Sequence, residues 1–122
     1  MDLTSPFAES LGLEFTTIEE GTSRCVLDLE DDHRNSRGVC HGGVLYTMAD
    51  TGMGVAVAAA LEDEDFATIE ATINYLRPAS GDTVVCETTV LRQGRSVIHL
   101  ESTLTDGDEV VARAMGTYAV LG

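Results

Sequence analysis

A long stretch, residues 44–61, constrains the fold more than any other part of the sequence. It contains no proline, and its side chains are mostly small or apolar. This length exceeds that of an ordinary buried strand, so the stretch predicts one long helix. Asp50 is the only charged residue in it. The small side chains let other elements pack unusually close, as a curved sheet wrapped around the helix would require; they are Gly52, Gly54, Ala56, Ala58, Ala59 and Ala60.

Strand-like segments precede this helix. Residues 14–19 and 22–30 alternate polar and apolar side chains on either side of the Glu-Gly pair at 20–21, which predicts a hairpin. Before them, Pro6 and Gly12 are placed to begin and end a short helix. The chain is therefore expected to open with a short helix and two antiparallel strands.

Further strands are predicted after an acidic loop, residues 62–65, that ends the long helix. The strand-like runs are residues 66–77, 83–92, 95–105 and 109–120. The Asp-Gly pair at 106–107 is typical of a hairpin turn. The predicted order is β-β-α-β-β-β-β after a short N-terminal helix, which is the α+β class with an antiparallel sheet around one long helix. We expect one domain over residues 1–122.

The charge of the chain narrows the classes of function. There are 21 acidic residues against 7 arginines, no lysine, and a formal net charge of −14. Such a charge argues against non-specific binding to nucleic acid or to anionic membranes. Acid excess without lysine is typical of proteins from salt-loving organisms, in which high salt screens the repulsion between acids. An ordinary acidic protein is the alternative.

The cysteines and histidines indicate neither a disulfide framework nor a metal site. Cys25, Cys40 and Cys86 are odd in number and far apart, so we expect reduced thiols. Together with the three histidines they lack the spacing of zinc ligands. The first ten residues lack the basic start of a secretory leader, and Asp50 interrupts the apolar stretch that could otherwise span a membrane. The expected location is the cytoplasm.

The start of the long helix is the first candidate site. His41, Gly42 and Gly43 lead into the helix, whose first turn leaves backbone N–H groups without intrahelical partners at the positive end of the helix dipole. Glycine lets a ligand oxygen approach these groups without meeting a Cβ atom. Considered alone, however, the two glycines are better explained as a tight turn into the helix.

Asp50 is the second candidate, because a carboxylate in an apolar helix is costly unless it is paired or used. The alternative is an acid that faces solvent or pairs with the hydroxyl of Thr47 or Thr51. Gly42 and Asp50 are separated by about 12 Å along the helix axis. A carbonyl oxygen about 3 Å from an amide donor at Gly42 cannot also touch a carboxylate so far away. If both act on one substrate, they come from two subunits, which predicts a two-fold dimer with composite sites.

Five features of the sequence form a recognisable combination: Asn35, His-Gly-Gly at 41–43, Asp50, Tyr-Leu-Arg-Pro at 75–78 and Arg-Gln-Gly-Arg at 92–95. This combination resembles the hotdog-fold acyl-CoA thioesterases, specifically the PaaI-like branch of the phenylacetate pathway, over roughly residues 8–120. The resemblance implies a hotdog fold and hydrolysis of an acyl-CoA to a free acid and coenzyme A. It implies no cofactor, since coenzyme A is part of the substrate.

The resemblance also implies catalytic roles for individual residues. The backbone N–H of Gly42 is the implied oxyanion donor, with Gly43 supporting the turn. Asn35 is implied to bind the thioester carbonyl or to orient the water. Asp50 of the other subunit is implied as general base or nucleophile, and the sequence leaves these two routes open. Thr68 is implied to position water beside the acid, although on its own it is an ordinary β-branched strand residue.

A second group of residues is implied to hold the substrate, and most of it falls where the family binds the nucleotide and pantetheine arm of coenzyme A. The group consists of His41, Tyr75, Arg92, Gly94, Arg95 and Ser96. A protein of charge −14 needs local cations to hold a polyphosphate, and two arginines flank a glycine here. A plain turn with solvated arginines is an equally simple explanation. The family's basic residue just past Pro-Ala is absent, with Ser80 in its place.

Other functions on the same fold are possible alternatives. A non-catalytic acyl-CoA binding or sensor protein would bind such esters without turnover. A hydratase or dehydratase usually pairs a histidine with the acid, and no histidine lies between Asp50 and His99. The expected partners are an acyl-CoA substrate and further copies of the chain, a dimer at least and a dimer of dimers by expectation.

Overall fold

The computed structural model describes residues 5–62 and 64–122. Residues 1–4 and residue 63, which belongs to the acidic loop predicted at 62–65, lie outside these ranges. The helices are α1 (Pro6–Leu11), the 3₁₀ helix η1 (Asp31–His33) and α2 (Gly42–Leu61); the strands are β1 (Glu14–Glu19), β2 (Thr22–Asp28), β3 (Phe66–Tyr75), β4 (Thr83–Gln93), β5 (Val97–Asp106) and β6 (Glu109–Val120). The predicted element order and the α+β class are confirmed.

Local signals account for the ends of several elements. Ser5 caps α1 by accepting a hydrogen bond from the Ala8 N–H, Pro6 is its first residue, and Gly12 ends it in the left-handed region. Several predicted boundaries are wrong by two residues: β2 ends at Asp28 rather than at residue 30, and β3 ends at Tyr75 rather than at residue 77. Arg95 and Ser96 were expected to begin β5, but they belong to a turn because the N–H of Gly94 donates to the carbonyl of Val97 at 2.9 Å.

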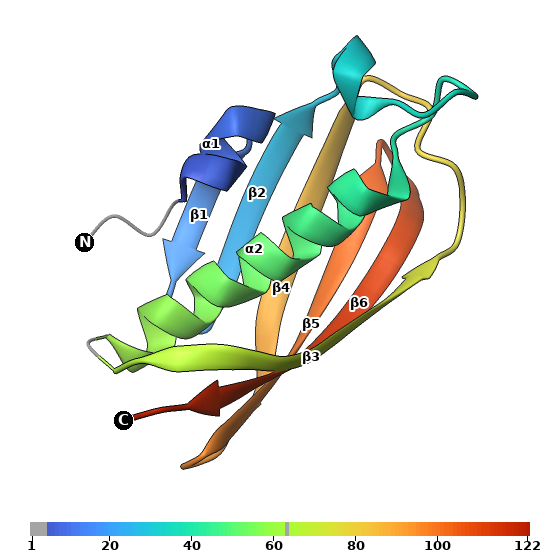
Figure 1. Cartoon of the computed structure of the whole chain (residues 1–122). Helices are drawn as coiled ribbons and strands as arrows, with labels where there is room; N and C mark the ends of the chain where they lie inside the picture. Colours follow the sequence, from blue (N-terminus) through green and yellow to red (C-terminus); the bar gives the residue numbers. More distant parts are fainter. Residues whose placement is uncertain (1–4, 63) are drawn as a thin grey trace.

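The strands form a six-stranded sheet in the order β1-β2-β4-β5-β6-β3, and every neighbouring pair is antiparallel. Figure 1 shows α2 lying across one face of this curved sheet. Because α2 connects β2 to β3 across that face, β3 pairs with β6 at the far edge rather than with β4. β1 and β3 are therefore the two edge strands.

The core lies between α2 and the concave face of the sheet. Alternate residues of the strands point toward the helix, so that Cys25 of β2 and Cys86 of β4 are paired neighbours and both are buried. The prediction that small helix residues allow close packing holds for Gly52, where a Cβ would lie 2.9 Å from Oγ1 of Thr88. It does not extend to Gly54, where an added Cβ would meet no atom of another described element within 4 Å.

α2 is long and apolar enough to cross a membrane if only length and composition are considered. Half of its most apolar 18-residue stretch is buried within the protein. α2 is thus the core helix of this fold.

Candidate active site

The loop that leads into α2 is held in place by its own hydrogen bonds. The N–H of Asn35 donates to Val39 and the N–H of Gly38 donates to Asn35, at 2.8 and 3.0 Å. The guanidinium of Arg34 donates to the carbonyls of Gly38 and Gly81, both at 3.1 Å, which ties the loop to the segment after β3. The path of the chain into the helix is therefore fixed.

Asn35 has one engaged and one available side-chain group. Its Oδ1 accepts a hydrogen bond from the N–H of Arg37 at 2.9 Å. Its Nδ2 amide has no acceptor among residues 5–62 and 64–122. The side chain can therefore donate a hydrogen bond to a ligand oxygen.

The first two N–H groups of α2 have different surroundings. His41 is the N-cap residue, and its Nδ1 accepts a hydrogen bond from the N–H of Gly43 at 2.9 Å. Because Nδ1 accepts, the proton of the neutral ring is on Nε2. The N–H of Gly42 has no acceptor in the described part of the chain. Gly42 thus offers a free donor at the positive end of the helix dipole.

Tyr75 of β3 packs directly on Gly42. Its hydroxyl donates to the Gly42 carbonyl at 2.8 Å, and a Cβ on Gly42 would lie only 3.1 Å from Cζ of the ring. Glycine is therefore the residue that fits here without displacing the ring. Burial raises the pKa of Tyr75, so its phenol remains a neutral donor.

A cavity of about 320 Å³ opens beside this helix start. Its lining is largely apolar and includes Val39, Leu45 and Leu76 together with Gly42. Cys40 also lines it, and burial raises the pKa of that thiol to about 11. Cys40 is thus present as a thiol rather than as a nucleophilic thiolate at neutral pH.

Asp50 lies half-buried two turns further along α2. Its Oδ1 accepts a hydrogen bond from the hydroxyl of Tyr118 at 3.0 Å. The hydroxyl of Thr47, one of the alternative partners considered for this acid, donates instead to the carbonyl of Gly43 at 2.8 Å. Within the described residues the second carboxylate oxygen, Oδ2, has no hydrogen-bond donor. Asp50 therefore has one anchored and one available oxygen.

Thr68 is a neighbour of Tyr118, the hydrogen-bond partner of Asp50. It lies on β3 directly across the ladder from Tyr118 of β6. Burial raises the pKa of Tyr118, while a hydrogen bond from the Thr68 side chain lowers it. The three side chains thus form one connected polar group under α2.

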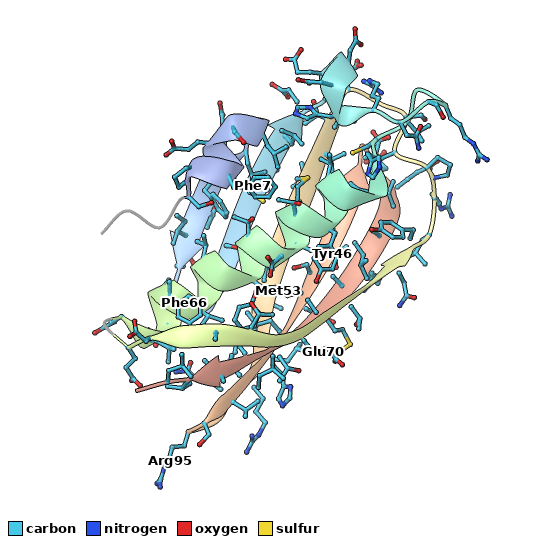
Figure 2. All side chains as sticks on the ribbon, viewed as in Figure 1. Phe7, Tyr46, Met53, Phe66, Glu70 and Arg95 are labelled. Carbon is cyan, nitrogen blue, oxygen red and sulfur yellow. The ribbon has the colours of Figure 1, made fainter. Side chains whose placement is uncertain are left out.

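The arginine-containing turn is remote from both groups within one chain. Arg92, Gly94, Arg95 and Ser96 lie at the end of the β4–β5 hairpin, and Figure 2 shows Arg95 projecting away from the start of α2. The Arg92 side chain folds back over Gly94, since a Cβ on Gly94 would lie 3.0 Å from its Nη1. Both arginine side chains are exposed.

The structure thus distributes the predicted site residues over three places in one chain. His41, Gly42, Gly43 and Tyr75 come together at the start of α2, with Asn35 on the loop before it; Asp50 and Thr68 share Tyr118; and the β4–β5 turn carries the remaining four. No group of three or more His, Cys, Asp or Glu in the described residues is placed to hold a metal ion.

Sequence reasoning missed Tyr118. This residue was assigned no role beyond its place in the last predicted strand. The available signal was the alternation in β6, which points Ala114, Gly116 and Tyr118 to the helix side of the sheet. A buried tyrosine hydroxyl needs a hydrogen-bond partner, so its presence among small core residues indicates a polar group on the facing helix.

Comparison with known families gives a match to the thioesterase superfamily over residues 37–113. Among curated proteins, the acyl-coenzyme A thioesterase PaaI of Escherichia coli is 32% identical over 91 residues, which are 72% of this chain and 62% of that protein.

Solved structures give closely similar folds. A conserved protein of Pseudomonas aeruginosa superposes with a TM-score of 0.93 at 33% identity, covering 98% of this chain and 96% of that one. A hypothetical thioesterase of Streptococcus pneumoniae, solved with coenzyme A, superposes with a TM-score of 0.84 at 25% identity, covering 90% and 86%.

Proposed function

Because the chain belongs to the thioesterase superfamily, as a PaaI-like hotdog protein and a thioester hydrolase, we propose that it hydrolyses acyl-CoA esters to a free acid and coenzyme A. Two similarities support this substrate class: the Escherichia coli relative is an acyl-coenzyme A thioesterase, and the Streptococcus pneumoniae protein was solved with coenzyme A. In this proposal coenzyme A is part of the substrate and no further cofactor takes part.

One observation carries the proposed mechanism. The same helix carries a backbone donor without an acceptor, the Gly42 N–H, and a carboxylate oxygen without a donor, Oδ2 of Asp50. About 12 Å of helix separates these two residues. One thioester carbonyl can therefore use both only if they belong to two different helices.

We propose that a second copy of the chain supplies the other helix. β3 is an edge strand, and on it Ile69 exposes 58% of its surface. Long apolar edge strands tend to pair with another strand. Antiparallel pairing of two β3 strands about a two-fold axis would bring the two copies of α2 side by side in opposite directions. Each of the two sites would then combine Gly42 of one subunit with Asp50 of the other.

In this arrangement the thioester oxygen accepts hydrogen bonds from the Gly42 N–H and the Asn35 amide. Gly43 and His41 shape the helix start, and Tyr75 lines the substrate channel. Asp50 either activates a water molecule or attacks the thioester carbon directly, and Thr68 lies on its side of the cleft. The negative charge that develops on the carbonyl oxygen is stabilised at the positive end of the helix.

The β4–β5 turn is proposed to hold the phosphates of coenzyme A. Arg92 and Arg95 form no ion pair with described acids, so both guanidinium groups are available to phosphate oxygens. Gly94 shapes the turn, since its N–H donates to the carbonyl of Val97, and Ser96 offers a hydroxyl donor. We further propose that the protein works in the cytoplasm at high salt concentration.

Replacement of the carboxylate tests the catalytic assignment. Asp50→Asn keeps an oxygen that can accept the Tyr118 hydrogen bond but removes the base, so kcat for an acyl-CoA ester is expected to fall by about 10³-fold or more with the melting temperature nearly unchanged. Glu87→Gln removes an exposed acid from the outer face of β4 and serves as the matched control with parental activity. Thiol release from a panel of acyl-CoA esters is the measurement. An Asp50→Asn enzyme with the parental rate would refute the assignment.

Mixing of variants tests the two-subunit site. Asp50→Asn and Gly42→Pro, each inactive alone, are unfolded together and refolded as a mixture. Random pairing makes half of the dimers mixed, and each mixed dimer contains one intact site, so about a quarter of the parental activity should return. Activity that stays at the level of the separate variants contradicts a site shared between subunits.

A further inference from the structure

Tyr118 is fixed by the core around it. It lies on β6, exposes only 2% of its surface, and packs against Phe66 of β3 with ring centroids 6.0 Å apart. A Cβ on Gly116 would approach the Tyr118 ring to 3.2 Å, so glycine at that position makes room for the ring. Close packing therefore fixes the position from which the Tyr118 hydroxyl contacts α2.

The Tyr118 hydroxyl has two possible acceptors on one residue. It lies 3.0 Å from Oδ1 of Asp50 and 3.1 Å from the backbone carbonyl oxygen of the same residue. The hydroxyl has one proton, and the carbonyl is inside a helix, where it already accepts an N–H from the next turn. A carboxylate is also the stronger acceptor. The proton is therefore directed to Oδ1.

Thr68 lies directly across the strand ladder from Tyr118. Its side chain lowers the pKa of Tyr118. Burial has the larger effect and raises the pKa of Tyr118, so the phenol keeps its proton at neutral pH. The Tyr118 hydroxyl is therefore the donor to Asp50 and the carboxylate oxygen Oδ1 is the acceptor.

We propose that Tyr118 is the positioning residue for Asp50, holding Oδ1 so that Oδ2 alone faces the substrate cleft. This inference depends on the proposed catalytic role of Asp50 and deepens it. Tyr118 itself touches neither the thioester nor the attacking water in this scheme. Its contribution is to fix the rotamer of the carboxylate before the substrate binds.

A purely structural role for the hydroxyl makes a different prediction. On that view the phenol only satisfies its own hydrogen-bonding need beneath the helix, and phenylalanine would preserve catalysis. The two roles are separated by Tyr118→Phe, which keeps the ring and its packing and removes one oxygen. Tyr46→Phe is the matched control. The hydroxyl of Tyr46, which is on α2 like Asp50, lies 3.5 Å from the carbonyl of Ala71 and has no hydrogen bond to a carboxylate among the described residues.

The test measures kcat and KM of the full-length protein with one acyl-CoA ester. Tyr118→Phe is expected to lower kcat by about 10- to 100-fold at nearly constant KM, since a misplaced catalytic group costs rate rather than binding. Tyr46→Phe should retain the parental kcat. A parental kcat in Tyr118→Phe overturns the inference, and so does a loss of kcat/KM that arises entirely from a raised KM.

A double-mutant cycle shows whether Tyr118 acts through Asp50. If it does, adding Tyr118→Phe to Asp50→Asn lowers kcat no further, because the group being positioned is already absent. The same fold-loss in both backgrounds would show an independent effect and refute the positioning role. A fully active Asp50→Asn enzyme would instead refute the proposed function, so the two failures are distinguishable.

Discussion

At the scale of single residues, the N-cap of α2 determines which backbone donor remains free. Histidine is not a usual N-cap residue, yet Nδ1 of His41 accepts the N–H of Gly43 as an Asp or Ser side chain would. The N–H of Gly42 precedes it and stays without an acceptor among the described residues. One ring nitrogen thus distinguishes two adjacent glycines that look equivalent in sequence.

The free N–H of Gly42 can be removed without changing the helix. Proline is well tolerated at the first helical position, and His41 already has the extended conformation that precedes proline, with φ −62° and ψ 135°. Gly42→Pro is expected to lower kcat by about 10²- to 10³-fold, as loss of an oxyanion donor does. The comparison is with Gly42→Ala, which brings the same Cβ contact with Tyr75 but keeps the N–H.

Thiol-release kinetics on both variants give the decisive ratio. The difference in kcat between the proline and alanine variants measures the contribution of the Gly42 N–H. The loss of kcat that both variants share measures the effect of the Cβ contact with Tyr75. Equal activities in the two variants would mean that the Gly42 N–H has no catalytic role.

At the scale of elements, local signals predicted much of the fold, while long-range pairing could not be predicted. Gly12 ends α1, and the Asp-Gly pair at 106–107 turns β5 into β6, because both act within a few residues. The placement of β3 beside β6 depends on a connection across the sheet face, which no local signal specifies. The same limit applies to the candidate site: motif spacing identified Asp50, whereas its partner Tyr118 is 68 residues away.

The edge strand β3 is where subunit pairing can be disrupted. Ile69→Arg places a charge on the exposed edge, and charged edge strands resist pairing. The variant is expected to sediment as a monomer, to keep the circular dichroism of the folded chain, and to lose nearly all activity because no composite site forms. Analytical ultracentrifugation and the thiol-release assay are the measurements.

Ile18→Arg on the opposite edge strand, β1, is the matched control. Ile18 is also exposed, at 40%, and lies at the other end of the strand order. This variant should remain dimeric and active. An Ile69→Arg protein that stays dimeric with full activity would contradict pairing through β3.

At the scale of the whole molecule, acidic charge dominates the surface. The net charge is −14, and the one ion pair between described residues, Arg77 with Glu109 at 3.6 Å, is exposed at both ends. Exposed pairs of this kind contribute little to stability. Acidic residues outnumber arginines 21 to 7, so the net repulsion between acids opposes the compact state.

This repulsion predicts a stability that rises with salt. The screening length falls from about 10 Å at 0.1 M to about 3 Å at 1 M salt, so the melting temperature should rise over that range and level off above it.

Glu19 and Glu20 are exposed neighbours at the β1–β2 turn, and Glu19→Gln/Glu20→Gln changes the net charge from −14 by 2, to −12. The variant should be more stable than the parent by about 0.5 kcal/mol in 0.1 M KCl, and this difference should vanish in 2 M KCl because screened charges no longer repel. A general effect of salt on hydrophobic burial would raise the free energy of unfolding of both proteins equally. The difference in stability between them would then stay unchanged. Urea unfolding of both proteins at the two KCl concentrations separates these causes, and a gap that persists at 2 M would show that charge repulsion is not what salt relieves.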